Sequence, residues 1–298
     1  QNISEDDITA VLEVLSSDFL TQGPKIPLFE DIVAEYCGAK FGVAVNSATS
    51  ALHAACHALG LGKGDYLWTS PNSYVASANC GLYCGAKVDF VDIDLRTYNL
   101  CVSKLEKKLI EAKKENKLPK VLVAVHFAGQ ACEMEKIKKL SSEYNFSVVE
   151  DASHSIGGKY LQQSIGSCEF SDITVFSFHP VKIITTAEGG MATTNSSELA
   201  RRMEIFRTHG VIRDEILMAK ETEGPWYYEQ IELGFNYRMT ELQAALGISQ
   251  MKRVDKFVSK RHELKKNYDL LLEDLPLIRP FLHNDCYSAL HLYPIQLE

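Results

Sequence analysis

The sequence predicts an α/β fold in which a largely parallel sheet is covered by helices on both faces. Short runs rich in β-branched residues alternate with longer segments of helical period, which is the pattern of consecutive β–α–β units. Most of the strand-like runs are too continuously apolar for a sheet with one face in water. At 298 residues, the chain is long enough for one large domain and part of a second.

The predicted elements follow in order from the N-terminus. Ser4 and Asp7 form a capping pattern for a first helix, whose apolar residues on one side are Ile8, Val11, Leu12 and Leu15. Apolar, β-branched runs predict seven strands, at residues 42–45, 66–69, 88–92, 121–126, 147–151, 173–178 and 191–194. Helical periodicity between them predicts helices at residues 49–59, 103–117, 133–144 and 197–208.

A change of pattern near Thr240 predicts a second domain. One long helix is expected from there to Leu275, where Pro276 and Pro280 break it. We therefore predict a large domain at residues 1–250 and the start of a small C-terminal domain at residues 251–298. Only one further strand-like piece, residues 291–297, follows the helix, so the small α/β domain is expected to be incomplete.

Composition excludes several classes of protein. A formal net charge of −8 argues against binding nucleic acid through a basic face. No stretch has the roughly 18 consecutive apolar residues of a membrane span. The eight cysteines are scattered, without a C-x-x-C pair, as in reduced cytoplasmic proteins, and the first 17 residues lack a signal-peptide pattern. His53 and His57 have helical i, i+4 spacing but no third ligand, so no metal site is expected.

Polar residues that directly follow strands are the first candidates for a binding site, because ligands of open α/β sheets lie beyond the carboxyl ends of the strands. Residues 46–50 (Asn-Ser-Ala-Thr-Ser) follow a strand and open a helix, where free backbone N–H groups can bind an anion. A simple helix N-cap is the alternative. Asp151 ends another strand and His154 lies three residues on. By themselves these two could be a helix cap or metal ligands.

Lys182 lies in a turn between two apolar strands, close to Pro180 and to the pair Gly189–Gly190. A lysine among apolar groups has a lowered pKa and can attack carbonyls, although a single loop lysine is more commonly a surface charge. The pairing with Asp151 is more specific. Pyridoxal 5'-phosphate needs a lysine that forms an imine with it, an acid that keeps its pyridine nitrogen protonated, and an anion site for its phosphate.

Four stretches carry a resemblance to a known family: "VNSATSALHAA", "VVEDASHSIGG", "FSFHPVKIITTAEGG" and "ELGFNYRMTELQAALG". They resemble the signatures of the DegT/DnrJ/EryC1/StrS family of pyridoxal-phosphate-dependent sugar aminotransferases, from about Gln22 to the end of the chain. Within that family the likeness is greatest to the UDP-4-keto-6-deoxy-N-acetylhexosamine 4-aminotransferases of pseudaminic acid biosynthesis. The family continues beyond a strand like "HLYPIQL", which leaves open whether this chain is active by itself.

The resemblance implies the aspartate aminotransferase fold (fold type I) and a homodimer with shared active sites. Carried over by position, Lys182 would form the Schiff base and move the proton, Asp151 would pair with the pyridine nitrogen, and His154 would lie near the ring hydroxyl. Tyr74 has the aromatic position that stacks on the ring. The remaining cofactor contacts implied by the family are those to the phosphate, from Thr49, Ser50, Ser177 and, across the dimer, Asn236 of the second subunit.

The resemblance also implies the reaction. The enzyme would move an amino group from L-glutamate to C4 of a nucleotide-linked 4-keto-6-deoxy sugar, with UDP as the expected nucleotide, for surface-polysaccharide or nonulosonic acid biosynthesis. Arg238 is a candidate for a substrate or interface contact, with a structural ion pair as the alternative. Two other functions are a sugar dehydratase, which has histidine in place of the lysine, and a non-catalytic relative. Lys182 argues against the dehydratase.

Overall fold

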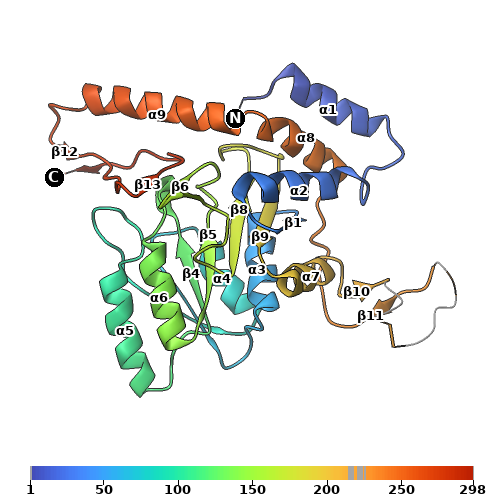
Figure 1. Ribbon diagram of the computed structural model, residues 1–298, viewed down its shortest axis with the longest axis horizontal. Helices are drawn as coiled ribbons and strands as arrows, with labels where there is room; N and C mark the ends of the chain where they lie inside the picture. Colours follow the sequence, from blue (N-terminus) through green and yellow to red (C-terminus); the bar gives the residue numbers. More distant parts are fainter. Residues whose placement is uncertain (1, 214–217, 220–223, 225, 298) are drawn as a thin grey trace.

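The core of the protein is a seven-stranded sheet, seen in a computed structural model that describes residues 2–213, 218–219, 224 and 226–297 (Figure 1). The strand order is β1-β9-β8-β5-β4-β2-β3. In chain order these strands are β1 (Phe41–Val45), β2 (Tyr66–Thr69), β3 (Lys87–Phe90), β4 (Val121–Val125), β5 (Ser147–Asp151), β8 (Ile173–Ser177) and β9 (Gly190–Thr194). Only β9 runs antiparallel to its neighbours, β1 and β8. The predicted mostly parallel α/β sheet is confirmed.

Helices cover both faces of this sheet, as its apolar strands require. Alternate residues of β4 enter two separate cores, Leu122 and Ala124 on one face and Val121, Val123 and Val125 on the other. The first face packs against α2 (Lys25–Cys37), α5 (Val102–Lys114) and α6 (Met134–Tyr144). The second packs against α3 (Ala48–Ala58), α4 (Ala76–Tyr83) and α7 (Ser197–Phe206). Figure 1 shows α5 and α6 on the opposite side of the sheet from α3 and α7.

Helices α2 and α4 were not predicted from the sequence. The α4 segment, ASANCGLY, is made mainly of small residues and has little apolar periodicity. Its packing explains that composition, because a Cβ at Gly81 would lie 2.9 Å from the Cβ of Leu67 in β2. The helix therefore approaches the sheet closely through small side chains rather than through a stripe of large ones.

The first helix, α1 (Glu5–Leu15), has the predicted capping box of Ser4 and Asp7. The apolar side of this helix does not face the core: Ile8, Leu12 and Leu15 are exposed. The buried side carries Asp7 and Val14 instead. The helix docks on α8 (Glu241–Met251) through polar contacts. Asp7 accepts a hydrogen bond from Gln250 Nε2 at 2.8 Å and forms an ion pair with Arg253.

The prediction of one continuous helix to Leu275 is wrong. Helix α8 ends at Met251 and α9 (Val254–Leu271) begins after a break at Arg253, whose φ and ψ of −121° and 5° are not helical. The proposed domain boundary at residues 250–251 falls at the end of α8, two residues before this break, and stays a prediction. None of the helices in the described part of the chain is both long and apolar enough to cross a bilayer.

The C-terminal segment contributes short strands rather than the single strand predicted at residues 291–297. β12 (Leu277–Ile278) pairs with β14 (Gln296–Leu297), and β13 (Cys286–Tyr287) pairs with β6 (Lys159–Tyr160), which also pairs with β7 (Gln163–Ser164). His291 is not in a strand because its backbone N–H donates instead to the carbonyl of Ala128 at 2.8 Å. This bond ties the segment to the loop that follows β4.

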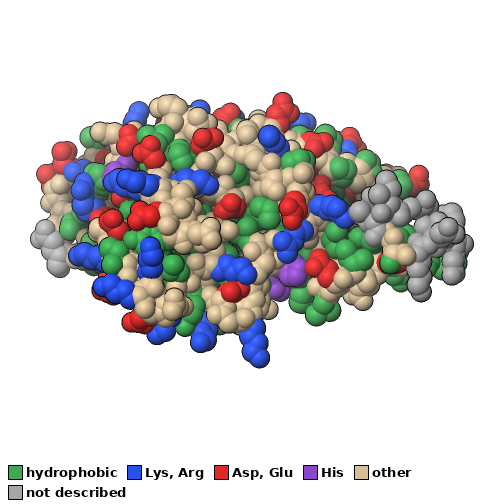
Figure 2. Space-filling view, turned by 60° about the horizontal axis from the view of Figure 1, so that its bottom comes forward, with side chains coloured by type: hydrophobic (Ala, Val, Ile, Leu, Met, Phe, Trp, Pro, Cys, Tyr) green, Lys and Arg blue, Asp and Glu red, His purple; other side chains and the backbone are tan. Residues whose placement is uncertain are grey.

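A two-stranded ribbon of β10 (Val211–Ile212) and β11 (Glu229–Gln230) extends from the sheet domain. On the face drawn in Figure 2, basic and acidic side chains are interspersed rather than gathered into a patch of one sign. A phosphorylated ligand on that face would therefore need local contacts rather than a broad positive field.

Candidate active site

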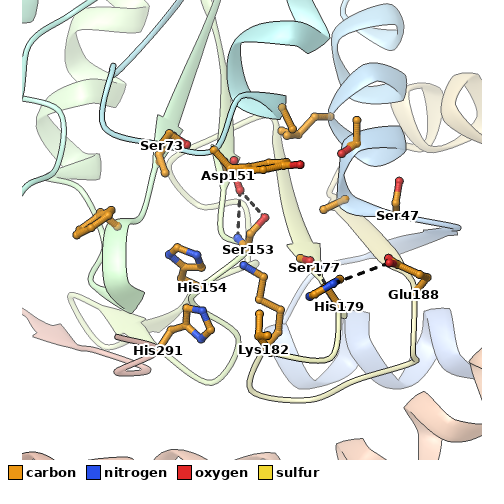
Figure 3. Close-up of a pocket in the computed structure, with 18 of the residues that line it drawn as sticks. Ser47, Ser73, Asp151, Ser153, His154, Ser177, His179, Lys182, Glu188 and His291 are labelled. Carbon is orange, nitrogen blue, oxygen red and sulfur yellow. Dashed lines mark hydrogen bonds and ion pairs between the residues drawn. The ribbon is translucent and has the colours of Figure 1, made fainter. Parts of the chain in front are cut away.

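A cavity of about 710 Å³ opens at the carboxyl ends of the central parallel strands. Its residues come from the ends of β5 and β8, the loops after β2 and β4, the N-terminus of α3 and the C-terminal segment. Their side chains converge on one space in Figure 3. Six of the predicted site residues line it: Thr49, Tyr74, Asp151, His154, Ser177 and Lys182. This is the place where open α/β sheets bind ligands.

The N-terminus of α3 forms one wall of the cavity. Ser47 is the N-cap, and its side chain accepts a hydrogen bond from the backbone N–H of Ser50 at 3.2 Å. The first helical residues, Ala48 and Thr49, face the cavity with Ser177 from the end of β8. Free N–H groups at a helix start, together with two hydroxyls, provide the donors that a phosphate needs.

Gly190 allows this wall to form. A Cβ at Gly190 would lie 2.5 Å from the carbonyl carbon of Ser47 and 2.6 Å from the amide nitrogen of Ala48. Strand β9 therefore packs directly against the turn that opens α3, and any side chain at position 190 would displace that turn. The steric requirement explains one of the paired glycines noted in the sequence.

Three predicted site residues do not line the cavity. The Ser50 hydroxyl is buried and donates to Asn46 Oδ1 at 2.7 Å. Asn236 lies in the loop before α8, where its carbonyl accepts from Asn46 Nδ2 at 3.4 Å. Arg238 lines two other hollows, beside Thr208 and Gln22. Their proposed roles stay predictions: the role of Asn236 concerns a second subunit, and that of Arg238 a substrate or interface contact, none of which a single chain contains.

The loop that carries Asn236 is joined to α3 by the two histidines that were set aside as metal ligands. His53 Nδ1 lies 3.1 Å from the Tyr237 hydroxyl, and His57 Nε2 lies 3.0 Å from Glu232 Oε2. Burial lowers the pKa of His53 to about 4, with a smaller contribution from His57. These contacts give both histidines structural partners.

Asp151 is 6% exposed at the end of β5 and points into the cavity. Ser77 Oγ donates to its Oδ2 at 2.6 Å, while Ser153 donates to Oδ1 from its hydroxyl at 2.6 Å and from its backbone at 3.2 Å. Among the residues that the structure describes, no lysine, arginine or histidine forms an ion pair with this carboxylate. A buried acid held only by neutral donors can accept a cationic group from a ligand.

Lys182 projects into the cavity from the loop between β8 and β9, on the side of Ser153 (Figure 3). A bond from its backbone N–H to the His179 carbonyl at 2.9 Å closes the turn, and the next residues, Ile183 and Ile184, are buried in the core. Burial lowers the pKa of Lys182, and the nearby charge of Asp151 opposes this shift. The amine is thus more readily neutral than a surface lysine.

His154 lies beside Lys182, and its ring packs against the ring of His291 (Figure 3). Burial, and next the charge of Lys182, lower the pKa of His154 to about 3. Its Nδ1 atom is buried and has no hydrogen-bond partner within the part of the chain that the structure describes. An orphaned nitrogen at this point is available to a polar group of a ligand, such as a ring hydroxyl.

Tyr74 stands at the open side of the cavity and is 76% exposed. Val75, which follows it in the sequence, and Val181, which lines the same cavity, are also exposed apolar residues. An aromatic ring at this position can cover the face of a flat ligand.

Several residues of the site were missed from the sequence: Ser153, His291 and Phe127 line the cavity, and Ser77 contacts Asp151 without lining the cavity itself. Ser77 and Ser153 are the donors to Asp151, and His291 and Phe127 flank His154. Ser153 was within the quoted "VVEDASHSIGG" stretch, two residues after the acid, and could have been found there. His291 and Ser77 had no such signal, because only the tertiary fold brings them to the strand ends.

The residues present fit pyridoxal 5'-phosphate on three observations of this structure. Among the described residues the buried acid has no basic partner and the nearby imidazole nitrogen has no hydrogen-bond partner, and a helix N-terminus with hydroxyls faces the same cavity. Asp151, His154 and the Thr49–Ser177 wall would hold the ring nitrogen, ring hydroxyl and phosphate. Lys182 supplies the amine that the cofactor carbonyl requires.

Comparison with known proteins agrees with this reading. A model described as the DegT/DnrJ/EryC1/StrS aminotransferase family matches residues 1–298. The UDP-4-amino-4,6-dideoxy-N-acetyl-beta-L-altrosamine transaminase of Campylobacter jejuni subsp. jejuni serotype O:23/36 (strain 81-176) is 39% identical over 298 residues, covering 100% of this chain and 75% of that protein.

Two solved structures are similar along the whole chain. Helicobacter pylori PseC, an aminotransferase involved in the biosynthesis of pseudoaminic acid, has a TM-score of 0.89 and 36% identity, covering 100% of this chain and 76% of that chain. The PLP-form of Spr1654 from Streptococcus pneumoniae has a TM-score of 0.87 and 27% identity, with the same coverage.

Proposed function

The chain belongs to the DegT/DnrJ/EryC1/StrS aminotransferase family, and we propose from this premise that it transfers the amino group of L-glutamate to C4 of a UDP-linked 4-keto-6-deoxy sugar. It is a pyridoxal-phosphate-dependent enzyme of the sugar aminotransferase type. The observation that carries the proposal is the convergence of Lys182 and Asp151, from neighbouring strand ends, on one cavity beside the N-terminus of α3.

Cofactor binding is assigned to five residues. Thr49 and Ser177 hold the phosphate, Asp151 the ring nitrogen and His154 the ring hydroxyl, while Tyr74 covers the ring. Bound pyridoxal 5'-phosphate supplies the chemistry, because its protonated ring accepts the electrons released when a proton leaves the amino carbon. Burial of Asp151 strengthens its attraction for a positive ring nitrogen, since less water screens the charge.

Lys182 has the two properties needed to move that proton. Its loop places the Nζ atom inside the cavity, and burial lowers its pKa so that a neutral amine is more accessible near physiological pH. As a neutral amine it takes the proton from the amino carbon, and as an ammonium it would deliver the proton to the carbon on the other side of the nitrogen, a 1,3 shift. The sequence neighbours Ile183 and Ile184 anchor the loop, so that the amine returns to the same place in each step.

The substrate is proposed from the relatives. One relative is named as acting on a UDP-linked 4-amino-4,6-dideoxy sugar and another as belonging to pseudoaminic acid biosynthesis. A cavity of about 710 Å³ has room for more than a cofactor ring, which is compatible with a sugar substrate. We place the product in the synthesis of a surface polysaccharide or nonulosonic acid.

A homodimer with shared active sites is part of the proposal. Two apolar residues that line the cavity are strongly exposed in a single chain, Tyr74 at 76% and Val181 at 58%, and Val75, next to Tyr74 in the sequence, is 60% exposed. Leu233 is 77% exposed on the loop that carries Asn236. Burial of these side chains against a second copy would remove apolar surface from water and bring Asn236 of that copy toward the phosphate.

The experiment is a substrate panel with matched nucleotides. Cofactor-loaded protein is given L-glutamate and a 4-keto-6-deoxy sugar linked to UDP, dTDP or GDP, and both 2-oxoglutarate and the amino sugar are measured by mass spectrometry. We expect kcat/KM for the UDP sugar to exceed the others by about tenfold or more, a typical result of specific polar contacts. Preference for another nucleotide, or loss of a sugar hydroxyl without gain of an amine, would contradict the proposed reaction.

A further inference from the structure

His154 has an unusual environment for a residue assigned to the cofactor. The structure gives its imidazole no hydrogen bond to any described residue, and its Nδ1 atom is buried. Two rings surround it instead. Phe127 presents an edge at 6.4 Å between ring centroids and 66° between planes, and His291 lies at 4.3 Å and 30°. The orientation of the imidazole is therefore set by ring packing, mainly by His291.

His291 is itself fixed in place by its backbone. Its N–H donates to the Ala128 carbonyl at 2.8 Å, and its carbonyl accepts from Arg261 Nη1 of α9 at 3.1 Å. The same Arg261 nitrogen also bonds to the Leu290 carbonyl at 3.1 Å. Gly129, at a φ of +103°, allows this approach, because a Cβ there would lie 3.0 Å from the amide nitrogen of His291.

The two imidazoles act as neutral rings rather than as acids. Burial lowers the pKa of His291 to about 3, with further contributions from His154, Lys182 and Arg261. Near neutral pH neither ring carries a proton charge that could be passed to a substrate. The contribution of His291 is thus its ring, held against His154 by a backbone that two other elements anchor.

We propose that His291 is a positioning residue, whose ring face holds the imidazole of His154 in the orientation in which His154 meets the cofactor. The inference rests on the proposed cofactor contact of His154 and is independent of the sugar substrate. The C-terminal segment, which is distant in the sequence from the strand-end motifs, would thus help directly to form the cofactor site.

The test compares two substitutions of His291 with a matched control. His291→Ala removes the ring, whereas His291→Phe keeps a flat ring and removes the nitrogens. His262→Ala is the control, because His262 stacks on Tyr287 at 4.3 Å and 9° but does not line the cavity. The dissociation constant for pyridoxal 5'-phosphate is measured by absorbance titration of cofactor-free protein, and folding is checked by circular dichroism and thermal unfolding.

We expect His291→Ala to weaken cofactor binding by about tenfold or more, the usual effect of losing a partner that orients a ligand-binding side chain. His291→Phe should remain within about threefold of wild type, and His262→Ala should be unchanged. Wild-type affinity in folded His291→Ala would overturn the proposal. So would an equal loss in the Phe variant, since that would assign the effect to the nitrogens rather than to the ring.

A double-mutant cycle separates this proposal from the one on which it rests. If His291 acts through His154, His291→Ala should add little loss of affinity in a His154→Ala background. Full additivity would overturn the positioning role while leaving the His154 contact intact. No effect of His154→Ala itself on cofactor affinity would overturn both, and would locate the failure in the assignment of His154.

Discussion

The hydroxyl of Ser77 donates a 2.6 Å hydrogen bond to Oδ2 of Asp151, although the two residues are 74 positions apart in the sequence. Ser77 lies on α4, a helix of small residues that packs closely on the sheet, and Asp151 ends β5. The bond fixes one oxygen of the acid, and Ser153 fixes the other. The carboxylate is thereby oriented before any ligand arrives.

Substituting Ser77 by Ala should weaken cofactor binding while leaving the fold intact. Hydrogen bonds to charged groups contribute about 1.5–3 kcal/mol, so we expect a loss of about tenfold or more in affinity for pyridoxal 5'-phosphate. Absorbance titration measures it. Ser142→Ala is the control, since that exposed hydroxyl on α6 donates only to a backbone carbonyl, of Lys138. Equal affinities for the two variants would show that Ser77 does not orient the acid.

Substituting Gly190 by Ala should displace the turn that opens α3. The added methyl group would lie within 2.6 Å of backbone atoms of Ser47 and Ala48, which cannot yield as a flexible side chain can. We expect the affinity for pyridoxal 5'-phosphate to fall while the content of helix and strand stays close to that of wild type. Cofactor titration measures the first and circular dichroism the second. Gly62→Ala is the matched control, because its Cβ would meet nothing within 4 Å. Normal cofactor binding by Gly190→Ala would disprove the steric account.

Acid should destabilise the cofactor-free protein through His154 and His291. Both have a pKa of about 3 in the fold, against an ordinary value of 6.5. Between these pH values the unfolded chain binds protons that the folded chain does not, so stability falls as pH falls from 6.5 toward 3. Each histidine contributes a slope of at most about 1.4 kcal/mol per pH unit.

Urea unfolding of wild type and His291→Phe at a series of pH values measures this effect. The variant lacks one of the two titrating rings, so its unfolding free energy should fall less steeply below pH 6.5. An identical slope in the two proteins would mean that His291 does not carry the depressed pKa.

Glu241 should be important for stability rather than for catalysis. It is 1% exposed at the start of α8, and its carboxylate accepts from the backbone N–H groups of Lys25 at 2.7 Å and Ile26 at 3.2 Å, which open α2. Glu241→Ala leaves one buried and one part-buried donor without a partner and should cost about 2–4 kcal/mol in the free energy of unfolding. Glu273→Ala, at an exposed position, serves as the control. A cost below about 1 kcal/mol, which is typical of an exposed contact, would contradict the capping role.

The strand ends were predictable because apolar, β-branched runs are locally distinctive. All seven strands of the sheet were found within two residues, and three residues at or shortly after strand ends, Thr49, Asp151 and Lys182, lie in one cavity. Helix α4 was missed because its small residues serve close packing, which leaves no apolar period to detect. The break at Arg253 was missed for a tertiary reason, since this residue turns to pair with Asp7 of α1.

The residues that hold Asp151 and His154 in place could not be predicted from the sequence in the same way. Ser77 and His291 reach Asp151 and His154 only through the packing of α4 and of the C-terminal segment. Ser50 shows the converse limit. It has the right position in the motif, but its hydroxyl is used by Asn46 and Ser47 within the turn. A motif gives the order of residues, whereas hydrogen-bond competition decides which of them face the ligand.

The most direct test of the central claim is to locate the cofactor on the chain. Protein saturated with pyridoxal 5'-phosphate is reduced with borohydride and digested, and the modified lysine is identified by mass spectrometry. Two variants are treated in the same way: Lys182→Ala and, as a control at an exposed lysine, Lys104→Ala. The account predicts one modified lysine, Lys182, in wild type and in Lys104→Ala, and none in Lys182→Ala. Stoichiometric modification of another lysine in wild type, or retained modification in Lys182→Ala, would contradict it.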